Sequence, residues 1–245
     1  MARIFISGSA DGLGQLAAKA LIAQGHQVVL HARNETRGQQ AMDQVRDAEG
    51  VVTADLASID DTKELASKVN ALGTFDAVIH NAGVYQDSAE VILAVNTLAP
   101  YILTCLIQRP ERLIYLSSGM HMQGHFRPES FKGQIGRISY SDSKLHVLML
   151  TKAVARRWTD VYSNAVDPGW VPTKMGGEGA PDDLQKGYET QVWLSTSNDA
   201  QARVSGKYFH HQRVTHHNPE ADDVRLQERF LSLCEEVTGV SFHEL

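Results

Sequence analysis

Tyr140 and Lys144 are the two side chains of this sequence whose types and spacing most clearly suggest chemistry. They lie four residues apart ahead of an apolar run, and residues at that spacing stack on one face of a helix. An ammonium beside a phenol stabilises the phenolate and lowers the tyrosine pKa by about 1–3 units from about 10. This pair therefore predicts general acid–base chemistry. An ordinary surface helix is the alternative, because Tyr-x-x-x-Lys is also common by chance.

Three glycines near the N-terminus, Gly8, Gly12 and Gly14, could hold the phosphates of a dinucleotide. They follow a short apolar run at 3–7, which predicts a strand buried on both faces. Apolar residues at helical spacing come next, and Gly25 ends that helix. Glycines let the backbone approach a pyrophosphate, and the helix N-terminus offers free N–H groups. The order Gly-x-x-x-Gly-x-Gly differs from the commoner Gly-x-Gly-x-x-Gly, so a purely structural turn is the alternative.

Arg33 bears on the choice of cofactor, because it stands just past a second predicted strand at 27–32. An acidic residue there would accept the ribose 2′-hydroxyl of NAD, whereas an arginine accommodates the 2′-phosphate of NADP. Arg33 therefore favours NADP over NAD. Glu35 could reach the ribose instead, and Asp11 adds negative charge to the glycine loop, so NAD stays open.

The elements that must position these residues alternate along the chain. Helices are predicted at 35–48 and 60–72, and strands at 51–54 and 75–80. This alternation predicts βαβ units and a parallel sheet, whose ligands bind at the carboxyl ends of the strands. Two segments stand at such ends, namely Asp55-Leu56 and Asn81-Ala82-Gly83.

The second half of the chain continues the pattern. A long apolar helix is predicted at 88–107, and Pro100 is expected to kink it. Asn96 is a poor residue for a helix interior, and one reason for it would be a backbone group that the kink exposes. Strands are predicted at 112–116, 160–166 and 206–210, and helices at 181–196 and 219–237. The stretch 120–136 has no clear periodicity and is expected to be a loop insertion ahead of the Tyr140 helix.

Composition excludes several classes of function. The 245 residues are 42% hydrophobic and 21% charged, as in an ordinary globular protein, and a net charge of −6 offers no basic surface to nucleic acid. Two cysteines and a few clustered histidines near 210–217 indicate neither a disulfide framework nor a metal site. No run approaches the ~20 apolar residues of a membrane span, and the early first strand leaves no room for a signal peptide. We therefore expect a cytoplasmic protein.

Taken in order, these motifs resemble those of the short-chain dehydrogenase/reductase family, of the classical type, over nearly the whole chain. The resemblance implies an α/β fold: a single Rossmann domain over 1–245, with a doubly wound parallel sheet of about seven strands. Residues 1–118 would form mainly the cofactor half, and 119–245 the catalytic helix, substrate loops and C-terminal helix. The implied cofactor-binding residues are Gly8, Ser9, Asp11, Gly12, Leu13, Gly14, Arg33, Asp55, Leu56, Asn81, Ala82, Gly83, Tyr140, Lys144, Pro168, Gly169, Val171 and Thr173.

The same resemblance implies that Ser118, Tyr140, Lys144 and Asn96 are catalytic. In this scheme Tyr140 donates a proton to a carbonyl oxygen that Ser118 holds in place. Lys144 lowers the Tyr140 pKa and holds the nicotinamide ribose, while Asn96 positions a water that links Lys144 to solvent. The implied substrate contacts are Ser118, Met120, Tyr140 and Trp170.

Departures from the usual pattern indicate a branch of the family. Ser7 replaces the usual threonine of the glycine motif, and His80 replaces a common second asparagine. Ser118 lies further ahead of Tyr140 than is usual, and the extra length falls in 120–136. This insertion, with LHARN at the second strand and SGKYF near the C-terminus, resembles the retinol-dehydrogenase-like branch. The choice of Ser118 over Ser117 rests on alignment with the family's Ser-Ser pair.

The expected function is NADPH-dependent reduction of a ketone or aldehyde to an alcohol. An NAD-dependent alcohol dehydrogenase of the same fold and a non-catalytic dinucleotide-binding regulator are the alternatives. The expected partner is a small carbonyl or alcohol substrate, bound in a mostly hydrophobic pocket under a mobile lid formed by 120–136 and 170–186. A homodimer or homotetramer is expected, since members commonly pair through the Asn96 and Tyr140 helices.

Overall fold

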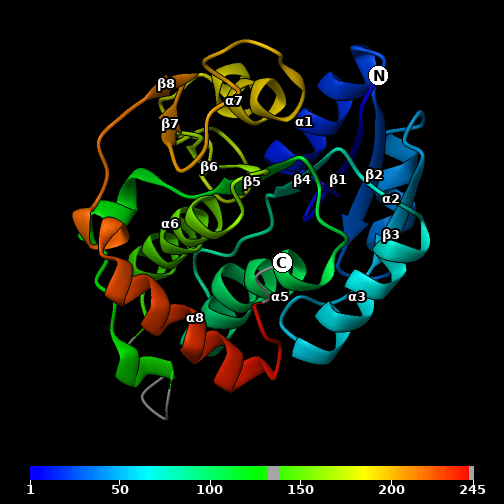
Figure 1. Cartoon of the computed structure of the whole chain (residues 1–245). Helices are drawn as coiled ribbons and strands as arrows, with labels where there is room; N and C mark the ends of the chain where they lie inside the picture. The colour runs from blue at the N-terminus through cyan, green and yellow to red at the C-terminus, as the bar shows by residue number, and fades with distance from the viewer. Residues whose placement is uncertain (132–137, 243–245) are drawn as a thin grey trace.

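The structure, a computed structural model, describes residues 1–131 and 138–242. Within these residues, eight strands form one sheet that carries helices on both faces (Figure 1). The strand order is β3-β2-β1-β4-β5-β6-β7-β8, and every pair is parallel except β7–β8. The strands are β1 (Arg3–Ile6), β2 (Gln27–Ala32), β3 (Gly50–Thr53), β4 (Ala77–His80), β5 (Arg112–Leu116), β6 (Tyr162–Asp167), β7 (Tyr208–His210) and β8 (Arg213–Val214).

The helices connect these strands in the alternating order that the sequence predicts, and short helical turns flank some of them. They are α1 (Gly12–Ala23), α2 (Glu35–Gln44), α3 (Ile59–Ala71), α4 (Ala89–Ile92), α5 (Ala99–Leu106), α6 (Tyr140–Arg157), α7 (Leu184–Thr196) and α8 (Val224–Thr238). A π-helical turn, η1 (Leu93–Leu98), joins α4 to α5, and 3₁₀ turns form at η2 (Gly119–Gln123), η3 (Pro128–Phe131) and η5 (Pro219–Asp222).

Alternate side chains of each strand enter two separate cores, which fixes the layers. In β1, Phe5 packs with one core, to which α3, α5, α6 and α8 contribute, while Ile4 and Ile6 pack with a second core formed with α1, α2 and α7. In Figure 1 α5, α6 and α8 of the first core lie below the sheet, and α1 and α7 of the second core lie above it. Burial on both faces explains why the strands read as continuous apolar runs.

The order of strands reverses at β1, which places a crevice at the centre of the sheet. Phe5 of β1 pairs with Val29 of β2 on one side and with Val78 of β4 on the other. The two connections leave in opposite directions, and ligands of open α/β sheets bind at such a point, beyond the carboxyl ends of the strands.

The predicted helix at 88–107 contains a π-helical turn rather than a simple kink. Pro100 has no N–H, and its ring crowds the carbonyl of residue 96, so a wider turn ahead of it relieves the conflict. By length and composition the run Ala89–Leu106 could cross a membrane, but 67% of it is buried inside the fold. It therefore has the burial of a core helix.

Three further elements differ from the sequence prediction. The short strand β8 was not expected, and it forms because His211 and Gln212 adopt left-handed backbone angles and reverse the chain after β7. The predicted helix at 219–237 is divided, since Asp223 caps a new helix by accepting from the N–H groups of Arg225 and Leu226. The predicted insertion contains η2 and η3, and its remainder, 132–136, lies outside the described residues.

Candidate active site

A cleft of about 820 Å³ opens at the carboxyl ends of the central strands. Its lining includes most of the residues that the sequence suggests for cofactor and catalysis. These are Gly8, Asp11, Gly12, Leu13, Arg33, Asp55, Leu56, Asn81, Ala82, Gly83, Tyr140, Lys144, Pro168 and Thr173. Others lie outside that lining, namely Ser9, Gly14, Asn96, Ser118, Met120, Gly169, Trp170 and Val171.

The glycine loop packs so closely on the end of β4 that larger residues would not fit. A Cβ on Gly8, whose φ is +63°, would lie 2.7 Å from the Cα of Ala82, and one on Gly14 would lie 2.4 Å from Nδ2 of Asn81. The Asn81 amide donates to the Gly8 carbonyl at 2.7 Å. The Ser7 hydroxyl accepts from the N–H groups of Asn81 and Ala82, so serine serves here in place of threonine.

Buried side chains of Ser9 and His31 hold this loop through hydrogen bonds. A cofactor contact is predicted for Ser9, whereas its hydroxyl is buried, donates to the Ile6 carbonyl and accepts from the His31 N–H. Nδ1 of His31 accepts from the Gly8 N–H at 2.9 Å, so Nε2 carries the proton and donates to the Ala54 carbonyl at 3.1 Å. Burial lowers the pKa of His31 to about 4, which keeps the ring neutral. The sequence offers little signal for His31 beyond its place near a strand end.

Asp11 forms ion pairs with two cationic side chains that line the cleft. Its carboxylate pairs with Arg37 of α2 and with Lys174, which follows β6. Burial raises the pKa of Asp11, but the hydrogen bonds from Lys174 and Arg37 outweigh burial and hold it below its usual value. Both cations line the cleft, and the motifs alone indicate neither. Arg37 lies in the first turn of α2, four residues after Arg33, and this closeness in the sequence is the signal that could have found it.

Arg33 and Glu35 occupy different positions relative to the cleft. Arg33 is exposed and lines the end of the cleft between β2 and β3, near Asp55. The Glu35 carboxylate instead accepts a hydrogen bond from the Thr53 hydroxyl, and Glu35 lies outside the lining. The structure therefore presents Arg33, and not Glu35, at this end of the cleft.

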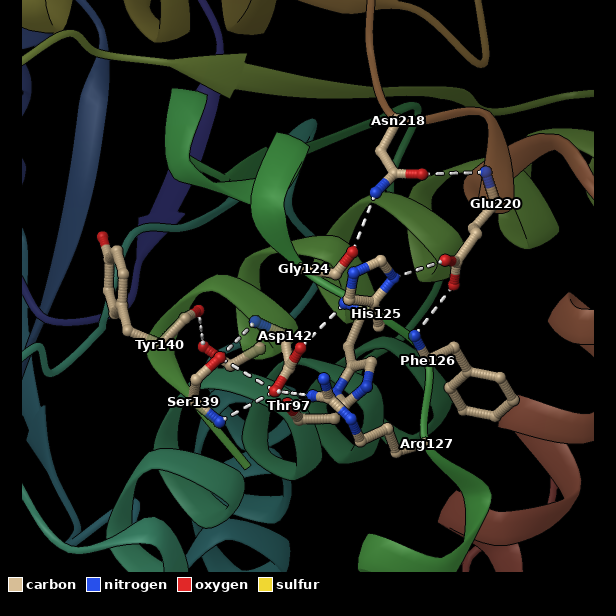
Figure 2. A network of polar contacts seen from close by, with 12 residues as sticks. Thr97, Gly124, His125, Phe126, Arg127, Ser139, Tyr140, Asp142, Asn218 and Glu220 are labelled. Atoms are coloured by element: carbon tan, nitrogen blue, oxygen red, sulfur yellow. Dashed lines mark hydrogen bonds and ion pairs between the residues drawn. The ribbon is translucent and has the colours of Figure 1, made fainter. Parts of the chain in front are cut away.

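A capping box starts α6 at Tyr140. The Ser139 hydroxyl accepts from the Asp142 N–H, and the Asp142 carboxylate accepts from the Ser139 N–H (Figure 2). One turn further on, Nζ of Lys144 lies 5.4 Å from the centre of the Tyr140 ring and donates to the Leu116 carbonyl at 2.8 Å. The helix thus presents both side chains to the cleft, as the spacing predicts.

The pKa of Tyr140 is shifted in the direction opposite to the prediction. Burial raises it to about 12, Asp167 and Tyr85 add to the rise, and a hydrogen bond with Ser118 opposes it. Burial likewise lowers the pKa of Lys144 to about 8. Desolvation disfavours both charged forms, and it outweighs the attraction between them. The phenol is therefore protonated at neutral pH.

Asn96 uses its side chain to hold the chain beside Lys144. Its Oδ1 accepts from the Val84 N–H at 2.8 Å, and its Nδ2 donates to the Val84 carbonyl and to the Ser143 hydroxyl. A Cβ on Gly83 would lie 3.3 Å from Nζ of Lys144 and 3.5 Å from Oδ1 of Asn96. The side chain thus satisfies groups of a neighbouring segment, not a group of its own helix. Oδ1 keeps one lone pair for a further donor such as water.

Ser117 and Ser118 have distinct environments. The Ser117 hydroxyl is buried and donates to the Lys144 main-chain carbonyl at 2.9 Å, which is a structural contact. The Ser118 hydroxyl accepts from the Met120 N–H, and the interaction of Ser118 with the phenol lowers the pKa of Tyr140 against the effect of burial. The geometry therefore favours Ser118 as the serine that shares a reacting group with Tyr140.

Several segments next to the site carry large apolar or aromatic side chains. Met120 and Trp170 are 37% and 60% exposed, and the Trp170 indole donates to the Gly176 carbonyl. Met175 lines the cleft, and the ring of Tyr85 meets that of Tyr140 edge-on at 4.8 Å between centres. The motifs alone do not indicate Tyr85.

The segment after β6 is held by its own turns. The Gly169 N–H donates to the Asp167 carboxylate at 3.0 Å, with φ of Gly169 at +79°, and Val171 is buried. Pro168 and Thr173 reach the cleft, and the Thr173 hydroxyl accepts from the Gly176 N–H. Of the four residues predicted here, two therefore line the cleft and two support the segment.

Comparison with known sequences identifies the group to which these features belong. The family model for short chain dehydrogenases matches residues 2–108. An uncharacterized oxidoreductase of Emericella nidulans is 45% identical, over 98% of each chain. Short-chain dehydrogenase chyC of Penicillium rubens is 39% identical, also over 98% of each chain. Retinol dehydrogenase 14 of Mus musculus is 26% identical, over 97% of this chain and 86% of its own.

Solved structures show the same fold. An uncharacterized protein from Mycobacterium paratuberculosis superposes with a TM-score of 0.83 at 22% identity, covering 99% of this chain and 95% of that one. A short chain dehydrogenase of Shigella flexneri, complexed with NADP, has a TM-score of 0.68 at 21% identity, covering 86% and 97%. The chain belongs to the short-chain dehydrogenase/reductase family of oxidoreductases, as a member of the classical type that resembles the retinol dehydrogenases.

Proposed function

We propose that this oxidoreductase reduces a ketone or aldehyde with NADPH, using Tyr140 as the proton donor. The observation that carries the proposal is the state of that phenol. It lines the cleft, interacts with Ser118, and is kept protonated by burial, which raises its pKa to about 12. Carbonyl reduction needs a donor at this position, whereas alcohol oxidation needs a base.

The residues around the cleft fit a nicotinamide dinucleotide. At Gly8 and Gly14 a Cβ would collide with Ala82 and Asn81, so the glycine loop packs directly on the segment that follows β4. No side chain caps the N-terminus of α1, which leaves its first backbone N–H groups available to a ligand. A helix N-terminus of this kind suits a pyrophosphate. When bound, the nicotinamide supplies the hydride, and the protein supplies orientation and proton handling.

Each side chain then has a defined task. Ser118 donates a hydrogen bond to the substrate carbonyl oxygen and sets its distance from the Tyr140 hydroxyl. Lys144, anchored by the Leu116 carbonyl, holds the nicotinamide ribose and replenishes the proton of Tyr140. Asn96 holds Val84 beside Lys144, and the remaining lone pair of its Oδ1 can hold a water on the route to solvent.

The preference for NADP rests on charge. Arg33, Arg37 and Lys174 all line the cleft, while the carboxylate of Glu35 is turned to Thr53. An extra phosphate at this end would meet cations, and an arginine at the end of the second strand accommodates a 2′-phosphate. The solved Shigella flexneri relative with bound NADP is consistent with this preference.

The substrate side of the site favours an apolar or aromatic carbonyl compound. Met175 lines the cleft, the ring of Tyr85 packs against that of Tyr140, and Met120 and Trp170 are large exposed side chains in the segments that follow β5 and β6. Exposed apolar side chains gathered near one cleft are typical of a binding surface. The similarity to retinol dehydrogenase, a protein named for an apolar alcohol, agrees with this class.

The test is a fluorescence titration with NADPH and NADH, followed by turnover of naphthaldehyde and phenanthrenequinone. We expect tighter binding of NADPH and its oxidation by at least one carbonyl. Turnover of alcohols with NAD and none of carbonyls would instead indicate the dehydrogenase alternative. Cofactor binding without turnover in either direction would indicate a dinucleotide-binding regulator.

A further inference from the structure

His121 lies directly behind Ser118, and its imidazole is completely buried. Its Nδ1 lies 2.7 Å from the main-chain carbonyl oxygen of Ser118, and its own N–H also donates to that oxygen, at 3.0 Å. On the far side of the ring, the N–H of Asn218 donates to Nε2 at 3.1 Å. The ring thus bridges Ser118, two residues after the end of β5, to Asn218, which precedes η5.

These contacts determine the tautomer of the ring. A backbone N–H has only a donor to offer, so Nε2 must accept from Asn218 and carry no proton. In a neutral imidazole the proton then resides on Nδ1, where it donates to the Ser118 carbonyl. The imidazole of His121 is therefore neutral and has a single orientation.

The Asn218 side chain strengthens the same bridge. Its Nδ2 donates to the Gly124 carbonyl at 2.9 Å and to the His121 carbonyl at 3.3 Å (Figure 2 shows the Gly124 contact). A Cβ on Gly124 would lie 2.4 Å from the Ser141 carbonyl oxygen, so the insertion is pressed against α6. The position of Ser118 relative to Tyr140 thus depends on contacts that the insertion makes.

A second set of contacts fixes the next part of the insertion. The buried Asp142 carboxylate accepts from the His125 N–H and from Arg127, both at 2.8 Å, while it also caps α6 (Figure 2). The Glu220 carboxylate accepts from the Phe126 N–H at 2.9 Å. The insertion is therefore held both by the catalytic helix and by η5.

We propose that His121 is a positioning residue: in its neutral Nδ1–H form it holds Ser118 at the distance from Tyr140 that proton transfer requires. The role in turnover rests on the proposed function, whereas the tautomer and the bridge do not. This role would explain why the insertion begins directly after Ser118: its first turn, η2, carries the His121 imidazole that holds Ser118.

Burial, more than the surrounding charges, favours the neutral form of the His121 ring. Burial lowers its pKa, and His217 and His216 add to that effect, whereas the hydrogen bond to Ser118 and the charge of Asp167 oppose it. The ring of Tyr208 packs against the imidazole at 4.6 Å between centres. Protonation would place an N–H on Nε2, facing the Asn218 N–H, and the bridge would open.

The first experiment reads the tautomer without any substrate. A long-range proton–nitrogen correlation spectrum of the protein, labelled at its histidine nitrogens, distinguishes Nδ1–H from Nε2–H rings. The His121 signals are assigned as those that vanish in His121→Asn. We expect an Nδ1–H ring that titrates below pH 6.5, the usual region of histidine titration. An Nε2–H ring, or one that titrates normally, overturns the proposal.

Two variants then separate the two ends of the bridge. The amide of His121→Asn can replace Nδ1 and donate to Ser118, whereas the amide of His121→Gln reaches the place of Nε2 and bonds only to Asn218. We expect His121→Gln to lower kcat by about 10-fold to 10²-fold, since small misplacements of reacting groups have such costs. His121→Asn should retain more of kcat, and neither should change the Kd for NADPH.

The control is His216→Asn, which removes an exposed imidazole two residues before Asn218. It should leave kcat at the wild-type value. Equal kcat values for wild type and His121→Gln would contradict the positioning role. If the wild type reduces neither carbonyl, the proposed function fails, while the tautomer measurement still decides whether the bridge exists.

Discussion

Lys174 and Asp11, which are 163 residues apart in the chain, meet at 3.1 Å across the mouth of the cleft. Arg37 pairs with the same carboxylate from the other side. Two segments that are far apart in the chain are thus joined through one acidic residue. Asp11 thus forms ion pairs with two cations, Arg37 and Lys174, that could otherwise bind the phosphates of an anionic cofactor.

We expect Asp11→Asn to tighten NADPH binding by up to about five-fold, because a partly exposed ion pair is worth at most about 1 kcal/mol and its loss frees Arg37 and Lys174. The gain should shrink at high salt. Fluorescence titrations at two salt concentrations measure it. Weaker binding in the variant would mean that Asp11 orders the loop in the shape that the cofactor needs.

Arg33→Ala should weaken NADPH binding by about 10-fold to 10²-fold and leave NADH binding nearly unchanged, because a charge-assisted hydrogen bond is worth roughly 1.5–3 kcal/mol. Glu35→Gln is the matched control, since its side chain faces Thr53. Equal losses for both cofactors would assign Arg33 a structural role instead.

Tyr140→Phe should lower kcat by at least about 10² while cofactor binding persists, because general acid catalysis typically contributes 10²–10⁴ in rate. Steady-state turnover and a cofactor titration of the same preparation measure the two quantities. Near-wild-type turnover would exclude Tyr140 as the proton donor.

Gly14→Ala should destabilise the protein by roughly 1–3 kcal/mol, as overpacking does, and abolish cofactor binding. The added Cβ would lie 2.4 Å from the Asn81 amide and 2.6 Å from the Gly8 carbonyl oxygen. Gly50→Ala, where no heavy atom lies within 4 Å of the Cβ, is the control. Thermal unfolding of both variants measures the destabilisation. Equal Tm values would show that the glycine loop can shift to accommodate the added methyl group.

Acid should destabilise the fold through its buried histidines. Burial lowers the pKa of His31 to about 4, of His146 to about 4 and of His80 to about 3. Between these values and about 6.5 the unfolded chain binds more protons than the native state, so stability falls as pH falls. Once the pH is below its native pKa, each ring lowers the free energy of unfolding by an amount on the order of 3 kcal/mol relative to neutral pH.

Denaturant unfolding at pH 7 and pH 5 measures this effect. The free energy of unfolding should be lower at pH 5, and His80→Gln should reduce the difference between the two pH values. A free energy that is the same at both would mean that these rings are protonated in the native state.

Local patterns in the sequence were sufficient for the framework. Apolar runs such as that around Phe5 predicted buried strands, and the spacing of Tyr140 and Lys144 predicted a shared helix face, because both periodicities belong to the backbone itself. The order of motifs along the chain then indicated the family. Predictions were least accurate where a few residues bend the chain, as at Pro100 and at His211.

The tertiary structure alone decided how the site is tuned. The pKa of Tyr140 depends on how far both its phenol and the Lys144 ammonium are removed from water. The four-residue spacing places the two groups side by side, but it does not determine how deeply the fold buries them. The partners of Asn96, Asp11 and His121 lie in distant segments, and only packing brings them within hydrogen-bond distance. Spacing thus determined which groups could react, while desolvation and long-range contacts determined their charge and their orientation.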